Sequence, residues 1–97
     1  PNPNVSIAVT KVISYKVYVL GRVNKPGEYV VGHYTDVLQA LSLAGGLTPF
    51  AAENEIKVMR RVRGEQYAIP FRYGDVRKGR DLEQNIILQR GDVVMVP

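Results

Sequence analysis

The residues with the clearest capacity for chemistry are basic and aromatic side chains in three parts of the chain. Lys16, Arg22 and Lys25 surround the Pro26-Gly27 corner, arginines cluster in "MRRVRGEQY", and a further basic run, "RKGR", spans residues 77–80. Guanidinium groups pair with anions and tyrosine rings stack on flat ligands, so these side chains suit an acidic sugar or a nucleic acid. The same residue types also protect sheet edges, form subunit contacts or face solvent. The candidate ligand-binding residues are Lys25, Arg60, Arg61, Arg63, Tyr67 and Tyr73.

Other chemistries lack the residues that they need. The 97 residues include no cysteine, which excludes disulfides, zinc–thiolate sites and cysteine nucleophiles. His33 is the only histidine, so a multi-histidine metal site cannot form. Asp75, Asp81 and Glu83 could supply a carboxylate pair for glycoside hydrolysis, but a polar connection does not fix their separation. The glycine-containing stretch "GRVNKPG" lacks the spacing of a phosphate-binding loop. The stretch "AGGLT" follows a predicted helix rather than preceding one, so it does not form the phosphate site of a helix N-terminus. We therefore expect no catalysis, no metal and no cofactor.

Length and composition indicate one small globular domain. The hydrophobic fraction of 45% and the charged fraction of 23% are close to average for such proteins. Thirteen Lys and Arg against nine Asp and Glu give a net charge of +4, a mild bias towards anionic partners. This excess is smaller than a dedicated nucleic-acid binder would carry, so the composition does not favour nucleic acid.

Alternating apolar residues predict strands in the first third of the chain. The pattern covers residues 4–12 and again residues 14–23, where Val17 and Val19 share one face. In "NKPG", Pro26 fits the second position of a tight turn and Gly27 the third, which requires a positive φ. The following "EYVV" then returns as a short partner strand.

Residues 35–47, "TDVLQALSLAGGL", predict the main helix. Its apolar stripe consists of Val37, Leu38, Leu41 and Ala44. Thr35 or Asp36 can cap the first turn. Gly45 fits the left-handed residue that ends a helix, and Gly46 extends the exit.

Residues 55–71, "EIKVMRRVRGEQYAIPF", predict a β-hairpin around Arg63-Gly64. Pairing Val62 with Glu65 places the apolar residues of both strands on one face, whereas a one-residue slip destroys this match. Pro70 cannot donate a ladder hydrogen bond, so its strand should lie at an edge.

The remaining chain predicts a polar connection and a strand pair. The connection covers residues 72–85, with one helical turn near residues 75–78. The last stretch, "IILQRGDVVMVP", is predicted as a strand, a Gly-Asp turn and a final strand. Several short strands and one helix predict an α+β fold, a sheet with the helix packed across one face.

Four motifs in this order resemble the soluble-ligand-binding β-grasp (SLBB) domain of bacterial polysaccharide export proteins. They are Gly21-Arg22-Val23 at the end of a strand, Pro26-Gly27 in the turn, Ala44-Gly45-Gly46 after the helix, and Gly91-Asp92-Val93 in the last strand. The resemblance covers residues 15–97. It implies that residues 14–97 form the SLBB domain, with a mixed sheet. Residues 1–13, which include Val5, Ile7 and Val9, resemble the last strand of a preceding polysaccharide export domain.

The resemblance also implies a function. It implies a non-catalytic periplasmic module of an outer-membrane-associated protein that exports capsule or exopolysaccharide. Its implied partners are the polysaccharide chain, other copies of the protein in a ring, and an inner-membrane polysaccharide co-polymerase. Proteins with this fold that carry cobalamin or take up DNA leave a small-ligand or nucleic-acid binding module as the alternative.

Overall fold

The computed structural model describes residues 14–32 and 34–97. The strand predicted over residues 4–12, the assignment of residues 1–13 to a preceding domain, and His33 all lie outside the described residues. The elements, in chain order, are β1 (Tyr15–Gly21), β2 (Gly27–Val31), α2 (Val37–Leu43), β3 (Ile56–Val62), β4 (Glu65–Phe71), α3 (Tyr73–Arg77), the 3-10 turn η1 (Leu82–Gln84) and β5 (Val93–Val96).

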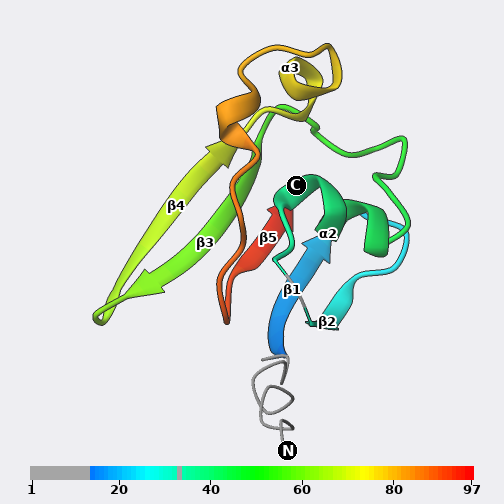
Figure 1. The fold of residues 1–97 in the computed structure, drawn as a ribbon. Coiled ribbons are helices and arrows are strands. Elements are labelled where there is room, and N and C mark those ends of the chain that lie inside the picture. The colour runs from blue at the N-terminus through cyan, green and yellow to red at the C-terminus, as the bar shows by residue number, and fades with distance from the viewer. Residues whose placement is uncertain (1–13, 33) are drawn as a thin grey trace, which may run out of the picture.

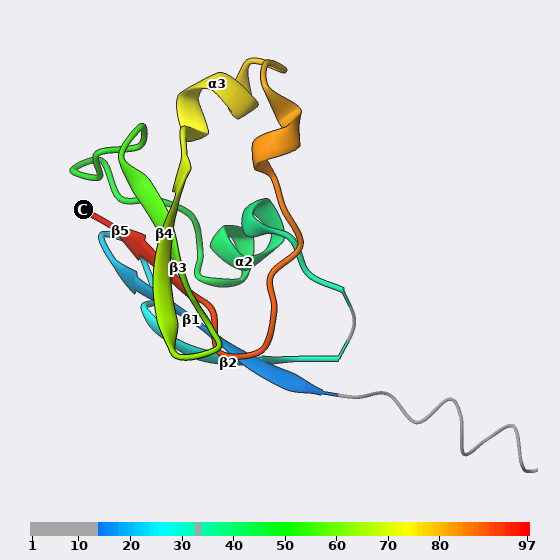
Figure 2. The ribbon, with the colours of Figure 1, turned by 90° about the vertical axis from the view of Figure 1, so that its left-hand side faces the viewer.

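One mixed sheet of five strands forms the body of the molecule, in the order β2-β1-β5-β3-β4 (Figure 1). The central pair, β1 and β5, is parallel, and the other three pairings are antiparallel. The helix α2 crosses one face of this sheet, as Figure 2 shows. The predicted α+β fold, with a β-grasp-like sheet and one main helix, is confirmed.

The core lies between the sheet and α2, as the alternation of valines in β1 predicts. Val17 and Val19 of β1 and Val94 and Val96 of β5 have no exposed surface, because they share the face that α2 covers. The helix contributes Val37, Ala40, Leu41 and Ala44 to the same cluster, and β3 and β4 add Ile56, Val58 and Phe71. Burial of each of these larger side chains contributes roughly 1.5–3 kcal/mol.

The main helix begins and ends where the predicted caps place it, at Val37 and Leu43 within residues 35–47. Asp36 is the N-cap, and its carboxylate accepts a hydrogen bond from the amide of Gln39 at 2.8 Å. The Gln39 side chain in turn accepts one from the amide of Asp36 at 3.0 Å, which completes a capping box. Gly45 and Gly46 have φ of 82° and 86°, the left-handed conformation expected after a helix.

The β-hairpin adopts the predicted register, with Val62 opposite Glu65 and Arg60 opposite Tyr67. Its two central residues, Arg63 and Gly64, have φ of 51° and 85°, as a two-residue turn of this kind requires. β4, which contains Pro70, lies at the edge of the sheet as expected.

The connection between β1 and β2 is wider than the predicted four-residue turn. It covers residues 22–26, and Gly27, with φ of 153°, is already the first residue of β2, opposite Val19. The loop is wide because it pairs with the chain that leaves α2. The Lys25 amide donates to Ala44 O at 2.8 Å, and Val23 forms a β-bridge with Leu47.

The predicted strand before the Gly-Asp turn is wrong. Residues 86–89 form only an isolated bridge, between Ile87 and Asp36. This segment runs beside α2 on the helix-covered side of the sheet, where no strand is available to pair with it (Figure 2). Its Leu88 is buried there, and the Leu88 amide donates to Thr35 O at 2.8 Å. The predicted helical turn near residues 75–78 is present as α3.

Gly21 gives a sharp test of how closely β1 and β5 approach. It has φ of +99°, and a Cβ at this position would lie 2.0 Å from the carbonyl oxygen of Val96. Gly21→Ala should therefore reduce the free energy of unfolding by about 2–5 kcal/mol, through backbone strain and overpacking. Gly64→Ala is the matched control, because Gly64 has φ of +85° with nothing within 4 Å of the added Cβ. It should cost only about 1–2 kcal/mol. Equal losses in urea denaturation would contradict the close approach.

Candidate functional site

The predicted ligand-binding residues occupy two opposite ends of the sheet. β3 is antiparallel to β5 and β5 is parallel to β1, so the hairpin tip lies where β1 begins and the 22–26 loop lies where β1 ends (Figure 1). Lys25 belongs to that loop, whereas Arg61, Arg63 and Tyr67 belong to the hairpin. The structure therefore does not bring all six candidates into one site.

The hairpin residues are exposed. Tyr67 is 49% exposed, and its hydroxyl donates to the carboxylate of Glu65 at 2.9 Å. Arg63 occupies the left-handed region with a φ of 51°, which costs an L-residue other than Gly, Asn or Asp about 1–2 kcal/mol. Arg61 and Arg63 form no side-chain hydrogen bond or ion pair within residues 14–32 and 34–97, so their charges face solvent.

Lys25 and Tyr73 lie apart from the hairpin. The side chain of Lys25 is exposed, and its carbonyl accepts a hydrogen bond from the Tyr29 hydroxyl. Tyr73, the first residue of α3, packs partly buried against the core. It lines a hollow of about 390 Å³ whose walls include Leu38, Leu41 and Leu47. Ser42, Gly45 and Gly46 also line this hollow, so it combines apolar side chains with polar groups.

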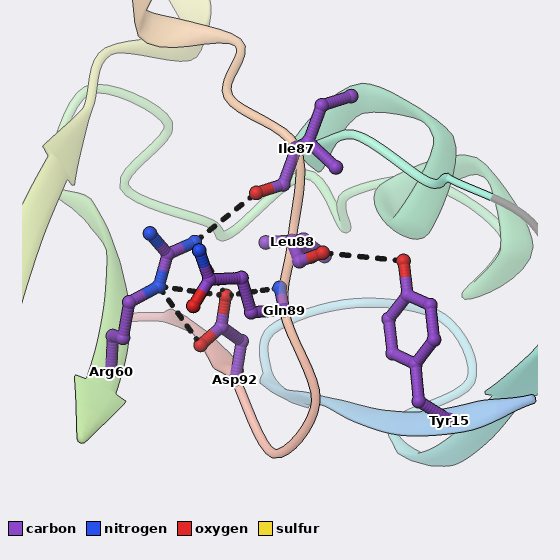
Figure 3. Close-up of polar contacts among 6 residues, drawn as sticks. All are labelled: Tyr15, Arg60, Ile87, Leu88, Gln89 and Asp92. Atoms are coloured by element: carbon purple, nitrogen blue, oxygen red, sulfur yellow. Dashed lines mark hydrogen bonds and ion pairs between the residues drawn. The ribbon is translucent and has the colours of Figure 1, made fainter. Parts of the chain in front are cut away.

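Arg60 holds a buried carboxylate. Its Nε lies 3.1 Å from both carboxylate oxygens of Asp92, and its Nη2 lies 2.7 Å from Oδ2. The Asp92 side chain is 1% exposed and the Arg60 side chain 16%. Figure 3 shows the guanidinium facing this carboxylate. Two parallel N–H donors to one carboxylate are the strong form of this interaction.

The same two side chains fix the segment that precedes β5. Arg60 Nη2 donates to the carbonyl oxygen of Ile87 at 3.1 Å, and the Gln89 amide donates to Asp92 Oδ2 at 2.8 Å. On the opposite side of the segment, the Tyr15 hydroxyl donates to Leu88 O at 3.2 Å (Figure 3). Arg60, predicted as a ligand contact, thus has most of its donors engaged inside the protein. Asp92 and Gly91 of the sequence motif form the turn that this network holds.

Beside this network lies a groove that the sequence did not indicate. A hollow of about 410 Å³ is lined by Tyr15, Tyr34, Ile87, Leu88, Gln89 and Arg90. A second hollow, of about 350 Å³, shares Tyr15 and Arg90 with it, but its Lys16 and Tyr18 belong to the face of the sheet opposite to Val17. We call the first hollow the Tyr15–Arg90 groove. Tyr34 and Arg90 are far apart in sequence. The bridge between Asp36 and Ile87 and the hydrogen bond from the Leu88 amide to Thr35 O join their two segments.

The described part of the chain holds no group of three His, Asp or Glu side chains that could bind a metal ion. Of the three carboxylates considered for hydrolysis, Asp75 forms an ion pair with Arg72 Nε at 3.0 Å, and Asp81 and Glu83 are exposed. None of the described helices is long and apolar enough to cross a bilayer.

Residues 16–70, more than half of the chain, match the family model of the SLBB domain. The chain belongs to the SLBB domain family. SLBB domains are soluble ligand-binding domains that are typical of polysaccharide export proteins, and the family is not known for catalysis. The match includes β2, α2 and β3 in full, and β1 without its first residue, Tyr15. Arg90 and Asp92 lie beyond the match.

The ion pair can be tested by removing either partner and then both. Arg60→Met leaves a carboxylate that is 1% exposed without its counter-ion, which should cost about 3–5 kcal/mol of unfolding free energy. Arg60→Lys keeps the charge but loses the two-donor geometry, so it should cost less. The double variant Arg60→Met/Asp92→Leu should be more stable than Arg60→Met alone, because no charge is left buried.

Arg61→Met is the matched control, because Arg61 is the next residue of β3 and is exposed. It should change the unfolding free energy by less than about 0.5 kcal/mol. A double-mutant cycle in urea that gives no coupling between Arg60 and Asp92 would contradict the proposed importance of the pair.

Proposed function

We propose that this SLBB domain is a non-catalytic periplasmic module of an outer-membrane-associated protein that exports capsule or exopolysaccharide. The observation that carries the proposal is the family match over residues 16–70, since the family is typical of polysaccharide export proteins. In this role the domain packs against neighbouring copies in a ring and contacts the polymer. An inner-membrane polysaccharide co-polymerase is the second protein partner.

The surface of the domain is compatible with such a role. Its net charge is +4, and the end of the sheet where β1 begins carries exposed arginines at the hairpin tip and at Arg90. Tyrosines at the same end offer flat apolar rings together with hydroxyl groups, a combination that suits sugars. A positive surface attracts an acidic polymer over a distance comparable to the Debye length, roughly 8 Å at physiological salt.

Deletion within the intact exporter tests this function. Removing residues 14–97 from the full-length protein in its own bacterium should abolish surface polysaccharide and leave the polymer inside the cell envelope. Immunoblotting of membrane fractions must show that the shortened protein still reaches the outer membrane. Arg80→Ala, at an exposed position of the polar connection, is the control that should leave surface polysaccharide unchanged.

Assembly and compartment are tested in the same strain. Cross-linking of the full-length protein should give oligomers, and fractionation should place the domain in the periplasm. Normal surface polysaccharide after the deletion, or a protein that cross-links only as a monomer, would contradict the proposal. Binding of DNA that weakens steeply with rising salt would instead support the nucleic-acid alternative.

A further inference from the structure

The Tyr15–Arg90 groove combines two kinds of surface that a charged sugar requires. Tyr15 and Tyr34 both line the groove, and Tyr34 has 81% of its surface exposed. A tyrosine ring packs against the C–H face of a sugar. Gln89, also in the lining, adds an amide that both donates and accepts.

The charge of the groove comes from Arg90. Among the described residues, no Asp or Glu lines the groove, and Lys16, which lines the neighbouring hollow, forms an ion pair with Glu28 at 3.2 Å. The Arg90 side chain makes no hydrogen bond or ion pair with any residue that the structure describes. A guanidinium without a partner can bind a carboxylate through two parallel N–H donors. The groove therefore has a place for one carboxylate next to aromatic rings.

The backbone of residues 87–91, along one side of the groove, is held by hydrogen bonds in the absence of a ligand. The Tyr15 hydroxyl is bonded to Leu88 O at 3.2 Å, which ties one wall to the other. The Gly91 amide donates to Lys16 O at 2.8 Å, and the Arg60–Asp92 pair holds the carbonyl of Ile87 and the amide of Gln89. A backbone held in this way loses little conformational entropy on binding, whereas the exposed side chains of Tyr34 and Arg90 become ordered when the ligand binds.

We propose that the Tyr15–Arg90 groove binds a uronic acid unit of an acidic polysaccharide. Arg90 receives the carboxylate of the unit, and Tyr15 and Tyr34 pack against its ring. This inference rests on the proposed function, because an exporter is what would present an acidic polymer to the groove. It assigns polymer contact to residues other than the six that the sequence suggested.

The test is titration of the 97-residue chain with tetragalacturonic acid, followed by NMR and calorimetry. The fully methyl-esterified tetramer is the matched ligand, because it has the same rings without the charges. Binding of the acid should shift the resonances of Tyr15, Tyr34 and Arg90. Arg90→Gln should weaken binding about tenfold or more, since a charge-assisted contact is lost. Tyr34→Ala should also weaken it, and Tyr34→Phe should retain most of the affinity.

The control variants lie at the hairpin tip, at the same end of the sheet. Arg63→Asn removes one positive charge and places Asn in the left-handed position, where it is well tolerated. Tyr67→Ala removes an exposed ring. Both should leave the affinity within about twofold of the original, a change of less than 0.5 kcal/mol. Circular dichroism and urea denaturation of each variant establish that it folds.

Three results would overturn the inference. They are no binding of the acid at millimolar concentration, equal binding of the methyl ester, and loss of binding in Arg63→Asn but not in Arg90→Gln. Failure of the groove is distinguishable from failure of the exporter role. If the deletion abolishes surface polysaccharide while the acid does not bind, only the groove is wrong. If the acid binds through Arg90 while the deletion has no effect on surface polysaccharide, only the exporter role is wrong.

Discussion

The ion pair between Arg60 and Asp92 is the interaction on which the arrangement of β5 depends. β5 has four residues, and it pairs with β3 at three positions, Lys57 with Met95, Val58 with Val94 and Met59 with Val93. Arg60 and Asp92 occupy the next position of this register, where their side chains rather than their backbones join the two chains. The carbonyl of Asp92 also accepts the amide of Tyr18 at 2.9 Å, at the point where the parallel pairing of β1 and β5 begins. One residue thus aligns β5 with both of its neighbours.

This alignment matters because the strand is short and its side chains alternate between the two faces of the sheet. A slip of one residue would move Val94 and Val96 from the core to the open face and would bury Met95 instead. It would also separate Asp92 from the guanidinium, leaving a carboxylate in a place that excludes water. A buried pair contributes little net stability, but the penalty for a separated pair is large. We infer that the pair specifies the register of β5 more than it stabilises the fold.

The sequence predicted those features that local patterns determine. Alternation in β3 and β4 fixes the hairpin register, and Pro70 marks an edge strand because it lacks an amide hydrogen. The end of the helix follows from Gly45 and Gly46, which adopt the left-handed conformation that residues with a side chain disfavour.

The incorrect strand at residues 86–89 and the wide 22–26 loop share one cause. In both, the backbone partners come from α2 and its flanks, distant segments that periodicity cannot reveal. Arg60 and Arg61 are adjacent arginines that the sequence alone does not distinguish. They differ because Asp92, the residue before β5, lies beside Arg60 in the folded chain. The Tyr15–Arg90 groove was missed because its walls meet through long-range pairing alone.

The distribution of arginine partners explains how one end of the domain can be both rigid and positively charged. Asp92 neutralises Arg60, so this pair adds structure without adding net charge to the surface. Arg90, two residues earlier in the same turn, has no such acidic neighbour in the described structure and keeps its charge exposed. Arg61 and Arg63 on the nearby hairpin add to the positive potential at this end of the sheet. A positive potential of this kind concentrates an acidic chain near the surface without selecting its sugars. Selection requires contacts of fixed geometry, and the turn held by Arg60 and Asp92 is where this domain can provide them.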